Sequence, residues 1–209
     1  MSKNLSLLAA GMIALFVASS PALALSSRTF VSGVGSDTGA CPVSTPCRTF
    51  AYALTQTAAS GEIIVLSSAG YGPVTITHAV SIINTSNFAG VTVAGGNGIT
   101  IAAGPSDTVV LRGLTVDGVG TGSNGIVFNT GGVLSMVNCI VQNFQTDGIV
   151  VAPSSGATKV DISNTIVSGN VNHGFFSIHS DQPRSKAPSV RRRPITTETS
   201  ASFYWAQQR

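Results

Sequence analysis

The sequence predicts an all-β fold, a right-handed parallel β-helix (a solenoid) with a short N-terminal capping helix. The first observation is a phrase that recurs four times, in which a turn-forming residue, a glycine and a short β pattern follow one another. Its glycines are 27, 23 and 26 residues apart, at Gly98, Gly125, Gly148 and Gly174. A repeat of this length is typical of a solenoid, in which each repeat forms one coil stacked on the last.

A second repeat lies between these phrases and has a matching spacing. Gly113, Asn138 and Asn164 are 25 and 26 residues apart, and each follows an apolar residue two positions earlier. Because Gly and Asn accept left-handed backbone angles at low cost, we expect a one-residue bend between two strands here. Each coil then contains about three short strands that pair in parallel with the next coil, and such crossovers wind right-handed.

The composition agrees with this architecture, since 23 of the 209 residues are Gly and only 9% are charged. Turn residues combined with Val, Ile and Thr suit a fold that bends several times in every coil. Within the repeated phrase, alternate residues should face the core and the solvent. The expected inward row is Ile99, Ile126, Ile149 and Phe175, and the expected outward row is Thr100, Val127, Val150 and Phe176.

Residues 1–24 are expected to be a secretory signal peptide. Lys3 supplies a basic start, residues 5–17 form an apolar stretch, and residues 21–24 end in the small-x-small pattern that signal peptidase accepts. Cleavage after Ala24 would leave a secreted or periplasmic protein without a membrane span, because no other apolar run is long enough for a membrane helix. An uncleaved anchor is the alternative.

Residues 25–60 are expected to form an N-terminal cap on the coils, which span residues 61–180. Residues 46–58 carry apolar side chains at helical spacing, and Thr45 followed by proline is a favourable helix start. Such a helix would lay its apolar side over the open end of the solenoid. Stacked folds require terminal caps of this kind to stay in solution.

The cysteines are interpreted in the light of export. Cys41 and Cys47 bracket a tight loop, and an oxidising compartment favours a disulfide between them, with two free thiols as the alternative. Cys139 occupies an inward position of the second repeat and is expected to be a small core residue. Because no other Cys or His lies near the first pair in sequence, we expect no metal site, and no cofactor is indicated.

Residues 181–209 break every pattern above. Glycine is absent there, and the net charge is +4, against −2 for residues 25–180. One interpretation is a disordered or folded-back tail whose residues 203–205 cover the open end of the last coil, and the other is an altered coding frame near residue 178. The arginine run at 191–193 has no interleaved scaffold, so nucleic acid is not an expected partner.

Four segments carry a resemblance to a known family: residues 30–33 (FVSG), 35–37 (GSD), 46–50 (PCRTF) and 61–65 (GEIIV). Together with the Gly/Asn bends, they resemble bacterial right-handed parallel β-helix proteins of the pectin-lyase-like superfamily, over residues 28–178. The resemblance implies the fold. It implies no single activity, because the superfamily includes polysaccharide lyases, glycoside hydrolases, epimerases, tail spikes and adhesins.

The catalytic members of that superfamily depend on carboxylates that lie together. Its polygalacturonases use clustered aspartates, and its pectate lyases bind calcium through carboxylates and remove a proton with a basic side chain. In the predicted register Asp117 stacks with Gln142, and Asp161 stacks with Ser135, so no two carboxylates share a row. This dispersal argues against both mechanisms and favours a protein without catalysis.

One row does bring candidate site residues together, because Asn124, Asp147 and His173 stand on successive coils, each just before the glycine. Adjacent strands lie about 4.8 Å apart, so these side chains can meet on one ridge. The functional interpretation is a polar binding ridge in which Asp147 and His173 form an acid/base pair. The alternative is that these residue types are present because they favour left-handed turn geometry.

The sequence therefore predicts an exported, non-catalytic β-helix scaffold or binding protein, with polysaccharide or cell-envelope components as its partners. The alternative is a polysaccharide lyase or glycoside hydrolase of the pectin-lyase-like type, with Asp147 and His173 as the candidate catalytic residues. Carboxylate clustering on the folded surface separates the two hypotheses.

Overall fold

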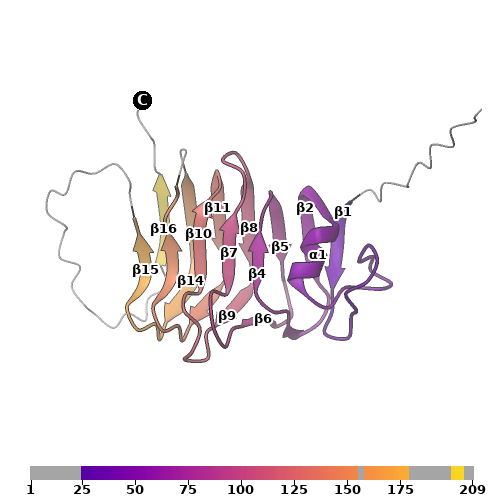
Figure 1. Cartoon of the computed structure of the whole chain (residues 1–209), viewed down its shortest axis with the longest axis horizontal. Helices are drawn as coiled ribbons and strands as arrows, with labels where there is room; N and C mark the ends of the chain where they lie inside the picture. The colour runs from indigo at the N-terminus through magenta and orange to yellow at the C-terminus, as the bar shows by residue number, and fades with distance from the viewer. Residues whose placement is uncertain (1–24, 155–157, 179–198, 205–209) are drawn as a thin grey trace, which may run out of the picture.

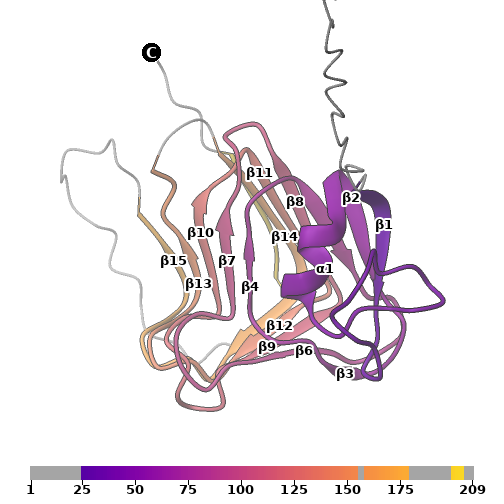
Figure 2. The same cartoon turned by 45° about the vertical axis from the view of Figure 1, so that its right-hand side comes forward.

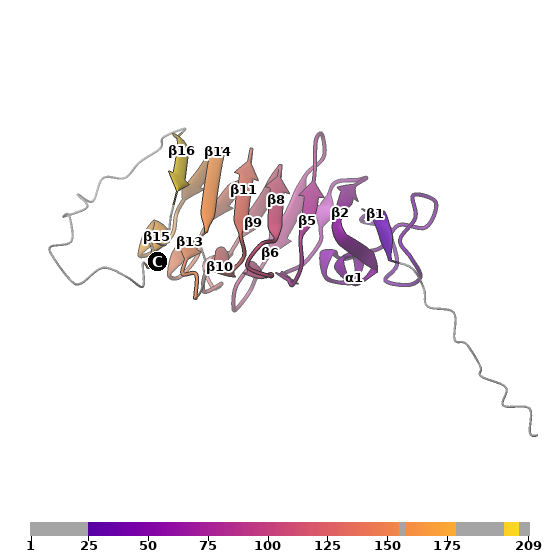
Figure 3. The same cartoon turned by 90° about the horizontal axis from the view of Figure 1, so that it is seen from above.

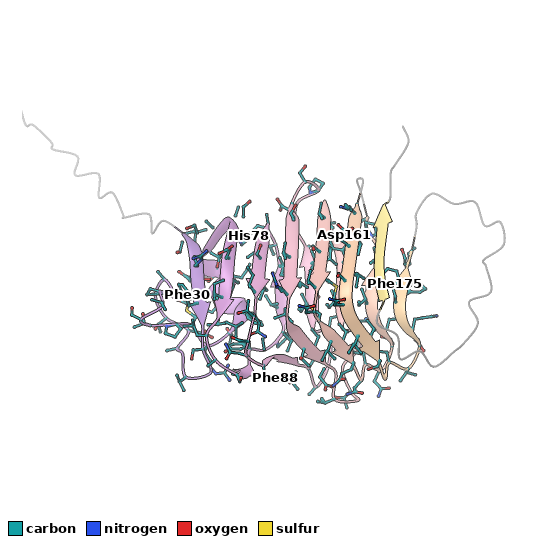
Figure 4. The ribbon with its side chains drawn as sticks, turned by 180° about the vertical axis from the view of Figure 1, so that it is seen from behind. Phe30, His78, Phe88, Asp161 and Phe175 are labelled. Atoms are coloured by element: carbon teal, nitrogen blue, oxygen red, sulfur yellow. A yellow bond between two sulfur atoms is a disulfide. The ribbon has the colours of Figure 1, made fainter. Side chains whose placement is uncertain are left out.

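The protein is a stack of parallel β-coils, seen here in a computed structural model. The structure describes residues 25–154, 158–178 and 199–204, so the predicted signal peptide lies outside the described residues. The coils follow one another along the long axis of the molecule (Figure 1). Phe30 and Phe175 lie at opposite ends of the stack (Figure 4). The prediction of a parallel β-helix is confirmed.

The walls of the stack are sheets A, B and C (Figure 2), of which A and B are joined through β14, and each coil runs through sheet A, then sheet B, then sheet C. Sheet A contains β1 (Ser26–Val31), β2 (Thr57–Val65), β5 (Val80–Ile83), β8 (Thr108–Arg112), β11 (Val133–Val137) and the first half of β14 (Lys159–Ser168). Sheet B contains β3 (Ala69–Gly70), β6 (Ala89–Thr92), β9 (Leu114–Asp117), β12 (Ile140–Gln142) and the second half of β14. Sheet C contains β4 (Val74–Ile76), β7 (Ile99–Ala102), β10 (Ile126–Thr130), β13 (Asp147–Val151) and β15 (His173–Ser177).

The predicted columns of side chains are confirmed in sheet C. Ile126 pairs with Ile99 on one side and with Ile149 on the other, and Ile149 pairs with Phe175. The three isoleucines are fully buried in the core. Burial of each such side chain stabilises the fold by about 1.5–3 kcal/mol, so these columns are a main source of its stability.

The predicted bends between sheets A and B are also confirmed. Gly113, Asn138 and Asn164 have φ angles of 69°, 54° and 46°. Asn164 lies inside β14 and turns that strand from sheet A into sheet B. The left-handed angle therefore explains why only Gly and Asn occupy this row.

The helix is shorter than predicted and starts later. Helix α1 spans Phe50–Gln56, and its N-cap is Thr49, whose hydroxyl accepts a hydrogen bond from the N–H of Tyr52. The predicted start at Thr45 is wrong because the N–H of Thr45 closes a turn onto the carbonyl of Pro42, and Cys47 then pairs with Val31. Three side chains of the helix, Phe50, Ala53 and Leu54, are buried in the solenoid core, so α1 does cap it.

Strand β1, which was not predicted from the sequence, already belongs to sheet A and pairs with β2. A disulfide joins Cys41 to Cys47, with 5.0 Å between the two Cα atoms, as predicted. The disulfide loop pairs with the outer edge of β1: the N–H of Phe30 donates to the carbonyl of Cys41, and the N–H of Cys47 donates to the carbonyl of Phe30 (2.9 Å each). The bridge therefore fixes the loop that covers the N-terminal edge of sheet A.

Removing this bridge should lower the free energy of unfolding. For the double variant Cys41→Ala/Cys47→Ala we expect a loss of about 2 kcal/mol in urea unfolding, because a closed loop of this length restricts the unfolded chain by about that amount. Reduction of the wild type should give a similar loss. Cys139→Ala is the control that leaves the bridge intact, and equal stability of bridged and unbridged protein would contradict the expectation.

Of the predicted tail, the structure describes only β16 (Thr199–Tyr204). This strand pairs antiparallel with β14, where Val160 lies opposite Phe203 and Ile162 lies opposite Ala201. Figure 3 shows β16 beside β14 at the C-terminal end of the stack. The pairing agrees with the fold-back alternative over these six residues, and the remainder of residues 181–209 lies outside the described part of the chain.

Candidate functional site

A row of polar side chains runs across the starts of the sheet C strands. It consists of Asn97, Asn124, Asp147 and His173, and we call it the polar ladder. Nδ2 of Asn124 donates to Oδ1 of Asn97 (3.1 Å), and the backbone N–H of Asp147 donates to Oδ1 of Asn124 (3.3 Å). The structure thus brings the three predicted binding residues together, and Asn97 extends the row by one coil.

The strongest contact in the polar ladder joins its last two members. Nδ1 of His173 lies 2.7 Å from Oδ1 of Asp147, and the backbone N–H of His173 donates to the same oxygen (3.1 Å). An ionised carboxylate only accepts, so Nδ1 carries the proton and Nε2 of the neutral ring is an acceptor. The Asp147 side chain is 14% exposed and that of His173 is 55% exposed, with the imidazole stacked on the ring of Phe176.

Turn geometry does not explain this row. None of the polar ladder residues has a left-handed φ angle; between sheets B and C, the residues with left-handed φ angles, from 43° to 75°, are Gly72, Gly96, Val119, Gly120, Asn143 and Gly169. Asp147 and His173 are instead the first residues of strands β13 and β15. The polar ladder therefore reflects hydrogen bonds from one coil to the next.

A second polar cluster lies at the ends of the sheet B strands. The carboxylate of Asp117 accepts hydrogen bonds from Nε2 of Gln142 (2.8 Å), Nδ2 of Asn143 (3.1 Å) and the backbone N–H of Val119 (2.8 Å). Burial raises the pKa of Asp117, but these three hydrogen bonds outweigh it, and the pKa lies below its ordinary value of 3.8.

The depressed pKa of Asp117 predicts a pH-dependent contribution to stability. A carboxyl group whose pKa is lower in the folded state stabilises the protein fully above its unfolded pKa, and that stability is lost as the pH falls through the folded pKa. Wild type should therefore have a higher urea midpoint than Asp117→Asn at neutral pH, and the difference should shrink below about pH 4. A difference that stays constant over the whole pH range would contradict this.

The carboxylates of the strands lie apart from one another, as the predicted register implied. Asp117 pairs with Gln142, and Asp161 pairs with Ser135. Asp161 instead forms an ion pair with Lys159 (2.8 Å), next to it on the same face of β14. Among the residues that the structure describes, no three His, Cys, Asp or Glu side chains are grouped so as to hold a metal ion.

A groove of about 600 Å³ lies between helix α1 and the outer face of sheet C. Figure 2 shows α1 next to β4 at the N-terminal end of the stack. The groove is lined by both threonine hydroxyl groups and apolar side chains, and no Asp, Glu, Lys or Arg lines it. Its lining is Leu25, Ala51, Leu54, Thr55, Pro73, Val74, Thr75, Thr77, His78, Asn97 and Thr100.

The groove and the polar ladder share Asn97, so they form one continuous polar track from the N-terminal cap to the last coil. His78, in the turn between β4 and β5, also lines the groove, and its Nε2 atom is buried without a hydrogen-bond partner among the described residues. The sequence did not predict the groove, because its two walls, α1 and sheet C, are separated in the chain and no spacing shows how the helix packs against the sheet.

The fold and its polar track define a parallel β-solenoid protein with a candidate binding surface on sheet C. No protein-family model matches the sequence, and no curated protein and no solved structure is detectably similar to it. In the described part of the chain, no helix has both the length and the apolar character needed to cross a membrane.

Proposed function

We propose that this protein is an exported, non-catalytic β-helix scaffold that binds an uncharged stretch of polysaccharide, a component of the cell envelope or its surroundings. The observation that carries the proposal is the polar track itself, in which a groove without Asp, Glu, Lys or Arg side chains continues into the polar ladder through Asn97. Extended ligands such as glycan chains suit a track that crosses several coils.

The chemistry of the groove supports a polyhydroxylated ligand. Thr75 and Thr77 are exposed and Thr100 is half-buried, so their hydroxyls can donate and accept hydrogen bonds. Leu25, which is 52% exposed, supplies an apolar surface for the C–H face of a sugar ring. Binding sites of this volume commonly combine an apolar lining with a few polar groups that fix the orientation of the ligand.

Export and family membership are part of the same proposal. The apolar stretch and the small-x-small ending of residues 1–24 support secretion, and the disulfide between Cys41 and Cys47 is compatible with an oxidising compartment. Membership of the pectin-lyase-like superfamily rests on the coil repeat and the segments at residues 30–33, 35–37, 46–50 and 61–65.

Binding should be measured against a panel of neutral and acidic polysaccharides by affinity electrophoresis and calorimetry. We expect retention by a neutral polymer, and Thr75→Trp should weaken it about tenfold or more by filling the groove. Thr92→Trp is the matched control, because Thr92 is an exposed strand threonine on sheet B, away from the groove. Equal binding by both variants would exclude the groove as the binding site. A lack of binding to any polymer would exclude the proposed function.

The contact between Asp147 and His173 favours one alternative, a polysaccharide lyase or glycoside hydrolase. The carboxylate holds the imidazole through Nδ1, which is the arrangement that lets Nε2 take a proton from a bound substrate. Against it, no second carboxylate shares the row of Asp147 in the described strands, as a hydrolase would need. Release of reducing or unsaturated ends that Asp147→Asn abolishes would establish the alternative.

A further inference from the structure

The three sheets are all covered at the N-terminal end of the stack. The disulfide loop pairs with the edge of β1 in sheet A. The guanidinium group of Arg48 donates to the carbonyl of Gly70 on β3 in sheet B (2.6 Å), and α1 packs next to β4 in sheet C. This end therefore offers little backbone for another strand to join.

The C-terminal end is covered unevenly. Strand β16 pairs with β14, so sheet A ends in an added antiparallel strand. In sheet C, β15 is the terminal strand, and no strand lies on its outer side within the part of the chain that the structure describes. Because the N–H of Ile178 donates to the carbonyl of Val151, and backbone groups alternate along a strand, the N–H and C=O of Ser177 point away from the stack.

This outer edge lacks the charges that usually protect edge strands. Between residues 169 and 178 the only ionisable side chain is His173, which already contacts Asp147. Apolar side chains are exposed beside the edge, with Val171 66% and Ile178 52% exposed. A copy of the same edge would meet no like charge, and it would cover these apolar groups.

We propose that β15 pairs antiparallel with β15 of a second copy, so that two stacks join through their C-terminal ends. A second copy fits because the edge is uncharged and because β16 shows that the last coil accepts an antiparallel strand. Because the N-terminal end is covered, a second copy cannot add to it head to tail. The contact between two C-terminal ends is therefore two-fold, and the assembly stops at the dimer.

Sedimentation velocity of the purified protein over a range of concentrations tests this directly. Wild type should form a dimer, and Ser177→Pro should be monomeric, because proline removes the outward N–H while the N–H groups that pair with β13 remain. Ser177→Val is the matched control, since it keeps the N–H, and it should remain dimeric. A wild type that is monomeric at every concentration, or that forms species larger than the dimer, would overturn the proposal.

A second variant controls for the possibility that proline disrupts the fold of the last coil. Ile178→Glu places a charge beside the edge without changing the backbone, and it should weaken the dimer at least tenfold with an unchanged circular dichroism spectrum. If Ser177→Pro and Ile178→Glu are both folded and dimeric, the contact lies elsewhere and the proposal is wrong.

Discussion

The variant Gly98→Ala is expected to lower the free energy of unfolding by about 3 kcal/mol. A Cβ atom at this glycine would lie 2.5 Å from Cγ1 of Val116 in sheet B and 2.7 Å from the carbonyl oxygen of Gly125 on the next coil. The backbone of the next coil is fixed by its own strand pairing, so it cannot move away without loss. Urea unfolding followed by circular dichroism measures the effect.

The matched control for Gly98→Ala occupies the equivalent position in the last coil. At Gly174, the nearest atom to an added Cβ is Cγ1 of Val167, at 3.5 Å, which is an ordinary van der Waals contact. Gly174→Ala should therefore be neutral or slightly stabilising, because alanine restricts the unfolded chain more than glycine does. Equal losses for Gly98→Ala and Gly174→Ala would contradict the packing explanation.

The second large effect is expected at Phe144. Its ring is fully buried at the corner between sheets B and C, so close to Gly118, Gly122 and Gly125 that a Cβ atom added at any of them would lie 3.0 Å or less from it. Truncation to alanine leaves a cavity that the surrounding strands cannot fill, so Phe144→Ala should cost about 3–5 kcal/mol of unfolding free energy.

Phe88→Ala is the control for Phe144→Ala. Phe88 is 54% exposed and lies just before strand β6. Its side chain is labelled in Figure 4. Its truncation should cost less than about 1 kcal/mol. If Phe88→Ala destabilises the protein as much as Phe144→Ala does, burial of the Phe144 ring at the corner between sheets B and C does not explain the loss of stability.

Much of the coil architecture was predictable because its cause is local and repeated. Ile99, Ile126 and Ile149 alternate with outward residues in every coil, so their burial follows from strand periodicity. The bends at Gly113, Asn138 and Asn164 followed from the few residue types that accept left-handed angles. Both features depend on residues within a single coil.

The features that were missed depend on contacts between coils or with the cap. The glycines of the repeated phrase suggested a turn, but Gly98 is needed because Val116 and Gly125 approach it closely. The helix begins only at Phe50 because the pairing of Cys47 with Val31 precedes it. The groove between α1 and sheet C required knowing how the cap docks, which no spacing in the sequence reveals.

The account depends on residues about 25 positions apart lying on neighbouring parallel strands. Thr75, Thr100, Val127, Val150 and Phe176 form one row in sheet C. Spin labels on Thr75→Cys and Phe176→Cys would measure the length of this row by pulsed electron resonance. Cys139 is buried and the other two cysteines are bridged, so the labels should react only at the two new thiols.

Four strand spacings of about 4.8 Å place the two labelled backbone positions about 19 Å apart, although 101 residues separate them in the chain. A narrow distance distribution near that value, allowing for the label arms, is the predicted result. A much longer distance, or a broad distribution without a peak in that range, would show that the coils do not stack and would contradict the account.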